Sequence, residues 1–148
     1  MSLWEWTLEA YSQPGVPEAC LTLQDEHGLN TAYLLWAVWA EGASDIQLNE
    51  AIGLTKSWDE AVLKPIRAIR RRLKPTFPGV EDDAREGLRE DVKAAELRAE
   101  RVLMETLETL AKNASGGRPA LDALIIACQA WGIKPPEDAL SALASALR

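Results

Sequence analysis

The sequence contains a single histidine, His27, so any imidazole chemistry in this protein would depend on that residue. Gln24 lies three positions before it, a spacing close to the Glu-x-x-His pairs that hold two metal ions in helical bundles. Such sites use that pair twice, with further glutamates, and one histidine beside a glutamine does not meet this requirement. A histidine in the last turn of a helix also interacts favourably with the negative end of the helix dipole. We therefore expect no metal at His27.

Nucleophilic residues also lack the partners that catalysis requires. Cys20 and Cys128 lie in apolar helical patterns without a Cys-x-x-Cys spacing, and neither has a histidine placed near it in the sequence. There is no Gly-x-Ser-x-Gly motif and no phosphate-binding loop of the Walker or dinucleotide kind. Gly116 and Gly117 before Arg118 could place an anion at a helix N-terminus, but we favour a flexible connector. We expect buried reduced thiols, no catalytic residue and no cofactor, and we favour a protein without enzymatic activity.

The strongest signal in the sequence is the distribution of basic residues. The first 55 residues contain eight acidic residues and no lysine or arginine, whereas seven basic residues fall between positions 56 and 74. On a helix over 58–74, four of them follow one another at spacings of three, four and three, which places them on one face. This basic face is our candidate binding site for a macromolecular partner, and it consists of Lys64, Arg67, Arg71 and Lys74.

Several partners, and one internal explanation, fit a basic face. An acidic protein, a nucleic acid and a phosphorylated ligand all present negative charge. Alternatively, the face neutralises its own chain, because residues 1–55 carry a charge of −8 and residues 81–108 a charge of −5. The net charge of −7 argues against general attraction to nucleic acid or to an anionic membrane. We therefore expect another protein as the partner, and self-association stays open.

The same segment provides a test for sequence-specific DNA recognition. Helices over 45–53 and 58–74 could form a helix-turn-helix, in which the N-terminal residues of the second helix read the bases. Those residues are Trp58, Asp59 and Glu60, and the two carboxylates would repel phosphate. This excludes specific reading of DNA, and non-specific nucleic-acid binding is kept as an alternative function.

Aromatic residues indicate a second candidate site. Four of the six tryptophans lie in the first 55 residues. They could contribute to a pocket for an apolar or planar ligand, with His27, Tyr33, Trp36 and Glu96 as the candidate residues. Trp6 points away from the apolar stripe of its helix, so it is either covered by another segment or is an exposed anchor. Helical cores also accommodate tryptophan. We favour core packing and keep a small-molecule-binding protein, with or without catalysis, as the other alternative function.

Helices must position all these residues, because the sequence lacks strand patterns. Three capping boxes mark helix starts, at Ser2, Ser44 and Ser57. Pro65 should kink its helix, because it has no N–H to donate to the carbonyl of Ala61. With the glycine and proline breaks, these signals predict a first helix that stops at Pro14, and then helices over 17–27, 30–41, 45–53, 58–74, 81–113, 119–131 and 136–147.

Two of these helices have patterns that predict how they pack. The helix over 30–41 is apolar in every direction, so neighbours should bury it on all sides. In the long helix over 81–113, Glu96 lies at the edge of an apolar stripe and needs a partner there. Arg67 or Arg70 is the candidate, because a short loop joins their helix to the long helix and the two should pack antiparallel.

A set of short blocks, spread over residues 3–110, carries a resemblance to a known family. The blocks are Leu3-Trp4, Tyr11, Pro14-Gly15-Val16, Cys20-Leu21-Thr22-Leu23-Gln24-Asp25, His27-Gly28, Asn30, Leu34-Leu35, Trp39, Trp58, Ile66-Arg67, Arg70-Arg71, Leu73-Lys74, Glu96-Leu97 and Ala99-Glu100-Arg101. Together they resemble an uncharacterised family, a domain of unknown function of about this length found mainly in proteobacteria. The resemblance implies an all-helical fold in short bacterial proteins. It brings no activity, ligand or catalytic residue, and it does not extend to the C-terminal segment.

We therefore expect a single all-α domain over residues 1–148. It should be a compact bundle of seven to eight helices around the buried helix 30–41, with the long helix 81–113 along one side. The longest apolar run, Thr31 to Ala40, has about half the length that crosses a bilayer, so we expect no membrane partner. The expected function is that of a cytoplasmic, non-catalytic interaction or regulatory protein, which binds its partner through the basic face.

Overall fold

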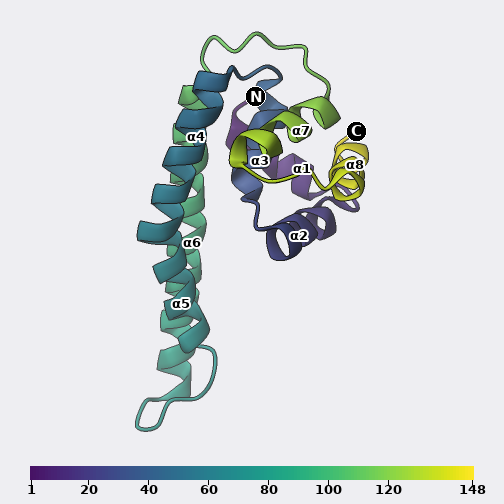
Figure 1. The fold of residues 1–148 in the computed structure, drawn as a ribbon. Helices are drawn as coiled ribbons and strands as arrows, with labels where there is room; N and C mark the ends of the chain where they lie inside the picture. The colour runs from purple at the N-terminus through teal and green to yellow at the C-terminus, as the bar shows by residue number, and fades with distance from the viewer.

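The computed structural model describes residues 1–148 and consists of helices and the loops between them (Figure 1). In chain order the elements are α1 (Leu3–Tyr11), α2 (Val16–His27), α3 (Thr31–Ala40), α4 (Asp45–Trp58), the π-helical segment η1 (Asp59–Leu63), α5 (Lys64–Arg72), α6 (Asp82–Leu110), α7 (Ala120–Trp131) and α8 (Glu137–Ala146). This confirms the predicted all-α fold. None of the helices combines the length and the apolar character needed to cross a membrane.

Side-chain caps fix where several helices begin, as the sequence predicts. The Ser2 hydroxyl accepts a hydrogen bond from the Glu5 N–H, and the Glu5 carboxylate accepts one from the Ser2 N–H. Ser44 and Gln47 form the same reciprocal pair at the start of α4. Each box satisfies backbone donors that the first turn of a helix leaves free.

The capping box predicted at Ser57 does not form, and this prediction was wrong. Residues 45–72 continue from α4 through η1 into α5 without a break. The Gly53 that was expected to end the helix costs only about 1 kcal/mol inside it. Leu48, Ala51 and Thr55 are buried on one face of α4, and this packing stabilises the helix on both sides of Gly53.

Pro65 is accommodated by the turn that precedes it. The Lys64 N–H donates to the carbonyl of Asp59, five residues back, so the hydrogen-bond register shifts by one residue just before the proline. In a regular α-helix the carbonyl of Ala61 would lack its donor, because proline has no N–H.

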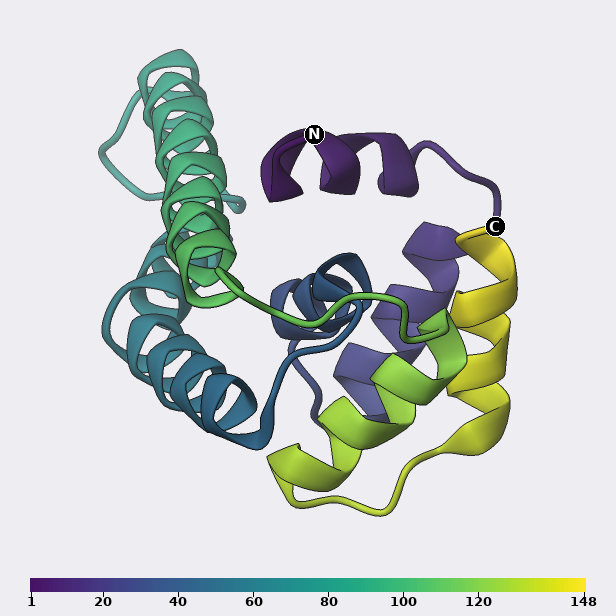
Figure 2. The same ribbon diagram turned by 90° about the horizontal axis from the view of Figure 1, so that it is seen from above.

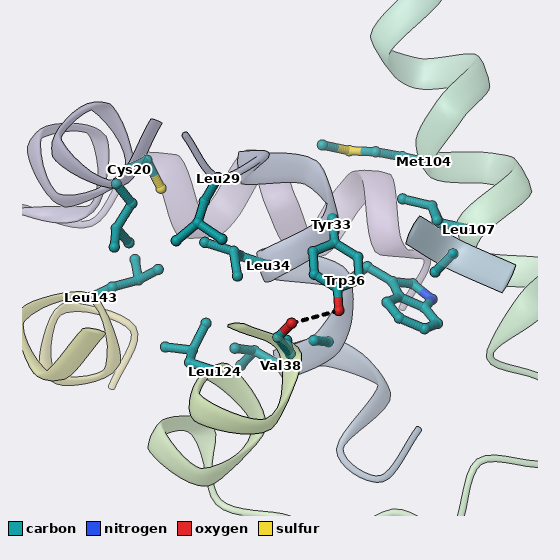
Figure 3. Packing of buried hydrophobic residues seen from close by; sticks show 14 of the residues in the cluster. Cys20, Leu29, Tyr33, Leu34, Trp36, Val38, Met104, Leu107, Leu124 and Leu143 are labelled. Carbon is teal, nitrogen blue, oxygen red and sulfur yellow. Dashed lines mark hydrogen bonds between the residues drawn. The ribbon is translucent and has the colours of Figure 1, made fainter. Parts of the chain in front are cut away.

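Helix α3 lies at the centre of the bundle, which confirms the prediction for residues 30–41. Figure 2 shows it surrounded by its neighbours, and it contacts α1, α2, α4, α6 and α7. Six consecutive residues, from Tyr33 to Val38, are buried. Figure 3 shows the packing around Tyr33, whose hydroxyl donates to the carbonyl of Ala127 in α7 at 2.8 Å. Trp6 is half-buried and packs against this core beside Trp39, so it is partly covered and is not a fully exposed anchor.

The continuous helix of α4, η1 and α5 packs antiparallel against α6, as predicted, and the pair extends beyond the rest of the bundle (Figure 1). Outside η1, α5 contacts only α6. We call α5, the loop 73–81 and the N-terminal half of α6 the arm. At its end Arg85 is buried and donates to the carbonyls of Leu73 and Lys74 at 2.7 and 3.0 Å. At its base the Trp58 indole donates to the carbonyl of Ala99.

The two C-terminal helices complete the core from the side opposite the arm. Helix α7 packs on α3, and α8 packs on α2 and α7. The chain reaches them along the segment Glu41 to Ala43, where the Arg118 N–H donates to the Glu41 carbonyl at 2.6 Å. Gly42 permits this close passage, because a Cβ there would lie 2.7 Å from the Gly116 nitrogen.

Candidate functional site

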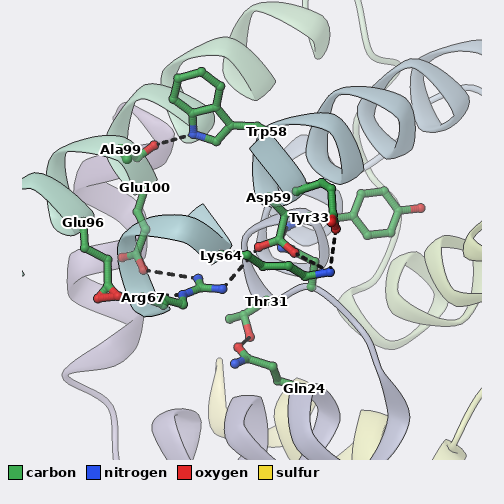
Figure 4. Close-up of polar contacts among 12 residues, drawn as sticks. Gln24, Thr31, Tyr33, Trp58, Asp59, Lys64, Arg67, Glu96, Ala99 and Glu100 are labelled. Atoms are coloured by element: carbon green, nitrogen blue, oxygen red, sulfur yellow. Dashed lines mark hydrogen bonds and ion pairs between the residues drawn. The ribbon is translucent and has the colours of Figure 1, made fainter. Parts of the chain in front are cut away.

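The predicted basic face divides into a paired half and an unpaired half. In the paired half, Lys64 Nζ lies 2.8 Å from Glu60 Oε2, and this hydrogen bond raises the pKa of Lys64. Arg67 has three acidic neighbours, at 3.2 Å (Asp59), 3.6 Å (Glu100) and 3.8 Å (Glu96). Figure 4 shows its guanidinium reaching between Asp59 and Glu100. For these two basic residues the charge is met within the chain.

Glu96 finds the partners predicted for it. Its carboxylate lies 3.0 Å from Arg70 Nε and 3.8 Å from Arg67 Nε, so both candidate arginines contact it. The side chain of Glu96 is 14% exposed. A carboxylate covered to this extent needs such compensation, so this cluster joins α5 to α6 as well as carrying charge.

The unpaired half lies at the end of α5. Arg71, Arg72 and Lys74 are exposed, and no carboxylate lies within ion-pair distance of any of them. Sequence reasoning included Arg71 and Lys74 and missed Arg72, which lies outside the strict helical stripe. The arm also carries exposed apolar side chains, which lie before and after these cations in the sequence: Ile69, Phe77, Val80 and Leu88. We call Arg71, Arg72 and Lys74 the basic end of the arm.

Two adjoining cavities lie where the arm meets the bundle. Their volumes are about 280 and 800 Å³, and they share Gln24, Asn30 and Arg67 as lining residues. Each also has a buried threonine in its wall, Thr7 in the smaller and Thr55 in the larger, and neither hydroxyl has a hydrogen-bond partner. Sequence reasoning missed this junction, although Asn30 and Gln24 belong to the blocks that carry the family resemblance.

The residues of the predicted aromatic pocket do not meet around one cavity. Tyr33 and Trp36 are fully buried in the core, and their rings stack with centroids 6.1 Å apart. The Trp36 indole N–H has no acceptor, contrary to the expectation for a buried tryptophan. His27 is half-buried at the last position of α2, and Glu96 lies in the arginine cluster of the arm.

The two cysteines are free and buried, on α2 and α7. Burial raises the pKa of each thiol, Cys20 and Cys128, to about 11. Since the thiolate is the nucleophilic form, both side chains are protonated and unreactive at neutral pH. No group of three histidine, cysteine or acidic side chains has the geometry to hold a metal ion.

Comparison with protein families gives one finding that bears on this site. A family model described as "Protein of unknown function (DUF2390)" matches residues 2–107. The match includes the arm, the arginine cluster and every residue that lines the smaller cavity, and it ends before α7 and α8. No curated protein and no solved structure matches the chain.

Proposed function

The chain belongs to the DUF2390 family of proteins of unknown function, and we propose that it is a cytoplasmic, non-catalytic interaction protein that binds an acidic surface of another protein. The contact is made through the basic end of the arm. The observation that carries this proposal is that Arg71, Arg72 and Lys74 have no acidic partner in a chain whose net charge is −7. Of the face predicted from the sequence, Lys64 and Arg67 are assigned to internal ion pairs instead.

The apolar neighbours of the basic end favour a protein partner over a nucleic acid. Phe77 is 62% exposed and Ile69 51% exposed, close in sequence to the three cations. Arginine and aromatic side chains together are enriched at protein interfaces. Glu81, Asp82 and Asp83 follow in the same part of the arm, so this surface carries charges of both signs, whereas a phosphate backbone is uniformly negative. An acidic protein surface with an apolar centre fits this arrangement better than a uniform line of phosphates.

The rest of the molecule supports a non-catalytic and cytoplasmic role. The sequence provides one histidine, which lines neither cavity, and the two thiols are held in their protonated form. Two unpaired, buried cysteines are the usual state of a protein in a reducing compartment.

The test is a charge reversal at the basic end, with a control of equal charge on the bundle. The test variant carries Arg71→Glu, Arg72→Glu and Lys74→Glu. The control carries Lys112→Glu, Lys134→Glu and Arg148→Glu, which are likewise exposed and have no ion pair. Proteins captured from an extract of the source cells are compared by quantitative mass spectrometry, and a protein lost with the test variant is purified and titrated against all three chains.

We expect the purified partner to bind the test variant at least about ten-fold more weakly than the control, mainly through slower association. The thermal midpoint of the test variant should stay close to that of the native chain, because these side chains make no internal ion pair. Equal partner binding by both variants, or a large loss of thermal stability in the test variant alone, would contradict the proposal. Binding of duplex DNA at low salt that the test variant abolishes would favour the nucleic-acid alternative instead.

A further inference from the structure

The smaller of the two junction cavities, of about 280 Å³, has a mainly apolar wall built from distant parts of the chain. Helices α1, α3 and α6 and the segment η1 all contribute to it. Leu63, Leu103 and Met104 line its buried side, and the rings of Trp4 and Tyr11 lie in its wall. Pockets of roughly 300 Å³ and above are the usual size for small ligands, so this cavity suits a compact one. A π-helical turn inside an α-helix also frequently lies at a functional site.

Two charged residues line this cavity, and they are not equally satisfied. Arg67 donates a hydrogen bond to Asp59 at 3.2 Å and also has Glu96 nearby. The Glu100 side chain is 38% exposed, and its only cation within ion-pair distance is Arg67, whose Nη2 lies 3.6 Å away, longer than an ordinary charge-assisted hydrogen bond. Burial raises the pKa of Glu100, and Arg67 opposes this only in part. Glu100 is therefore a half-buried carboxylate on the wall of an apolar cavity, with one long ion pair as its only charged contact.

The charge around the cavity favours a cation over an anion. Four carboxylates (Asp59, Glu60, Glu96 and Glu100) share three cations, Lys64, Arg67 and Arg70. A carboxylate or phosphate ligand would meet this acidic excess, and a neutral apolar ligand would cover the exposed part of Glu100 and leave it only the long ion pair with Arg67, which costs free energy. An ammonium group would donate to Glu100, and aromatic faces in the wall attract cations as well.

Neutral polar groups at the rim can complete such a site. The Asn30 side chain uses its oxygen to cap the Tyr33 N–H, which leaves its two amide hydrogens free. Gln24 accepts a weak hydrogen bond from Thr31 at 3.4 Å (Figure 4). The hydroxyl of Thr7, a residue only 3% exposed, has no hydrogen-bond partner. Polar groups of this kind, in a cavity wall that carries a weakly paired carboxylate, are what a polar head group would use.

We propose that this cavity binds a small organic cation: a primary or secondary ammonium group on an apolar or aromatic skeleton. The ammonium group donates to Glu100, and the skeleton lies against Trp4, Leu103 and Met104. This inference is independent of the proposed protein partner, because it uses none of the three residues of the basic end.

The first test compares three probes of nearly the same shape that differ in charge. Phenethylamine supplies the cation, 2-phenylethanol is its neutral counterpart and 3-phenylpropionate carries the negative charge. Binding to the full chain at pH 7 is measured by isothermal titration calorimetry and by the change in tryptophan fluorescence, since Trp4 lines the cavity. We expect the amine to bind with a submillimolar dissociation constant and at least about ten-fold more tightly than the alcohol. No binding of the amine at millimolar concentration, or equal binding of amine and alcohol, would overturn the proposal.

The second test assigns the preference to one carboxylate. Glu100→Gln keeps the shape of the side chain and removes its charge, and Asp91→Asn removes one charge from an exposed, unpaired position on the same helix. We expect Glu100→Gln to lower the affinity for phenethylamine at least about ten-fold and to abolish the preference over 2-phenylethanol. Asp91→Asn should bind both probes as the native chain does. Equal loss in both variants would show that the amine responds to general charge and would overturn the site.

A third variant tests whether the apolar skeleton of the ligand lies in the cavity. Leu97→Trp enlarges a side chain of the cavity wall that is 54% exposed, so it fills space without disturbing the core. It should weaken the amine and the alcohol together, and unchanged binding of both would place them elsewhere on the protein. The variant altered at the basic end of the arm should bind phenethylamine normally, and Glu100→Gln should capture the protein partner normally. Failure of one proposal is therefore distinguishable from failure of the other.

Discussion

The carboxyl group of Glu100 lowers the free energy of unfolding by an amount that depends on pH. Burial raises the pKa of its carboxyl above the value of 4.5 that an exposed glutamate has. The charged form is therefore less favourable in the folded chain than in the unfolded chain. This cost is fully present above the folded-state pKa, and it disappears as the pH falls below 4.5, where both states are protonated.

We expect Glu100→Gln to increase the free energy of unfolding slightly at pH 7 and to have no such effect near pH 4. Chemical denaturation of the native and variant chains at both pH values measures this difference. Asp91→Asn, at an exposed position, is the control and should show no gain at pH 7. A clear loss of stability in Glu100→Gln at pH 7 would mean that its attraction to Arg67 outweighs the burial.

Some contacts of single residues follow from the sequence and others do not. The pairing of Glu96 with Arg67 and Arg70 could be predicted, because an acidic residue inside an apolar stripe requires a cation from the helix that packs against it. The division of the basic face could not. Whether Arg71 has an acidic neighbour depends on which residue of α6 lies opposite it, and helical periodicity does not determine that register.

At the scale of elements, one side chain holds the two sides of the arm together at its end. Arg85 is 7% exposed, and it donates to the carbonyls of Leu73 and Lys74 as well as to Glu86. These bonds satisfy the carbonyls of the C-cap residue of α5 and of the residue that follows it. Because α5 has no tertiary neighbour other than α6, and the ion pairs of Arg67 and Arg70 lie nearer the base of the arm, Arg85 is the main polar link between the two sides at the end of the arm.

Arg85→Ala should therefore loosen the arm locally. Hydrogen bonds to a charged group contribute about 1.5–3 kcal/mol each, so we expect amide hydrogen exchange in residues 70–88 to accelerate about ten-fold or more. Exchange in α3 should be unchanged, because local opening does not require global unfolding. Arg98→Ala removes an exposed arginine of α6 without an ion pair and serves as the control. Uniform acceleration across the whole chain would contradict local opening.

Helix ends could be predicted where the cap was the strongest local signal, and not where packing outweighed it. Ser44 and Gln47 begin a helix, since a loop precedes them and Ser44 is exposed. Ser57 and Glu60 have the same spacing, but Trp58 donates its indole N–H to α6 and Leu63 is buried. The capping motif specifies a local hydrogen-bond pattern, and tertiary packing decides whether the chain uses it.

At the scale of the whole molecule, the family match ends earlier in the chain than the folded core does. The match stops at residue 107, yet α7 and α8 cover α3 and α2. Tyr33, at the centre of the bundle, bonds to the backbone of α7, and Leu124 and Leu143 are fully buried. The chain up to α6 would leave these faces of α2 and α3 exposed to water.

A chain truncated after residue 110 should not form the native core. We expect it to lose its near-ultraviolet circular dichroism and its cooperative thermal transition, because apolar burial is the main stabilising contribution to a core. It should also bind a hydrophobic dye strongly while keeping much of its helical far-ultraviolet signal. A cooperative thermal transition in the truncated chain would show that residues 2–107 fold independently.

The junction cavity lies beyond what sequence patterns can predict at this scale. The residues that give it its chemistry come from four elements: Tyr11 from α1, Gln24 from α2, Arg67 from α5 and Glu100 from α6. Periodicity assigns each of them to a face of its own helix. It does not give the crossing angles that bring those faces together, so the central helix could be predicted and the cavity beside it could not.

The 29 residues of α6 make it about 44 Å long, and it lies along the longest dimension of the molecule (Figure 1). A body of this outline does not tumble in water as a sphere does. Rotation about the long axis is fast, and end-over-end rotation is slow. The amide N–H bonds of α6 point along that axis and reorient only with the slow rotation, whereas those of helices that run across it reorient with both.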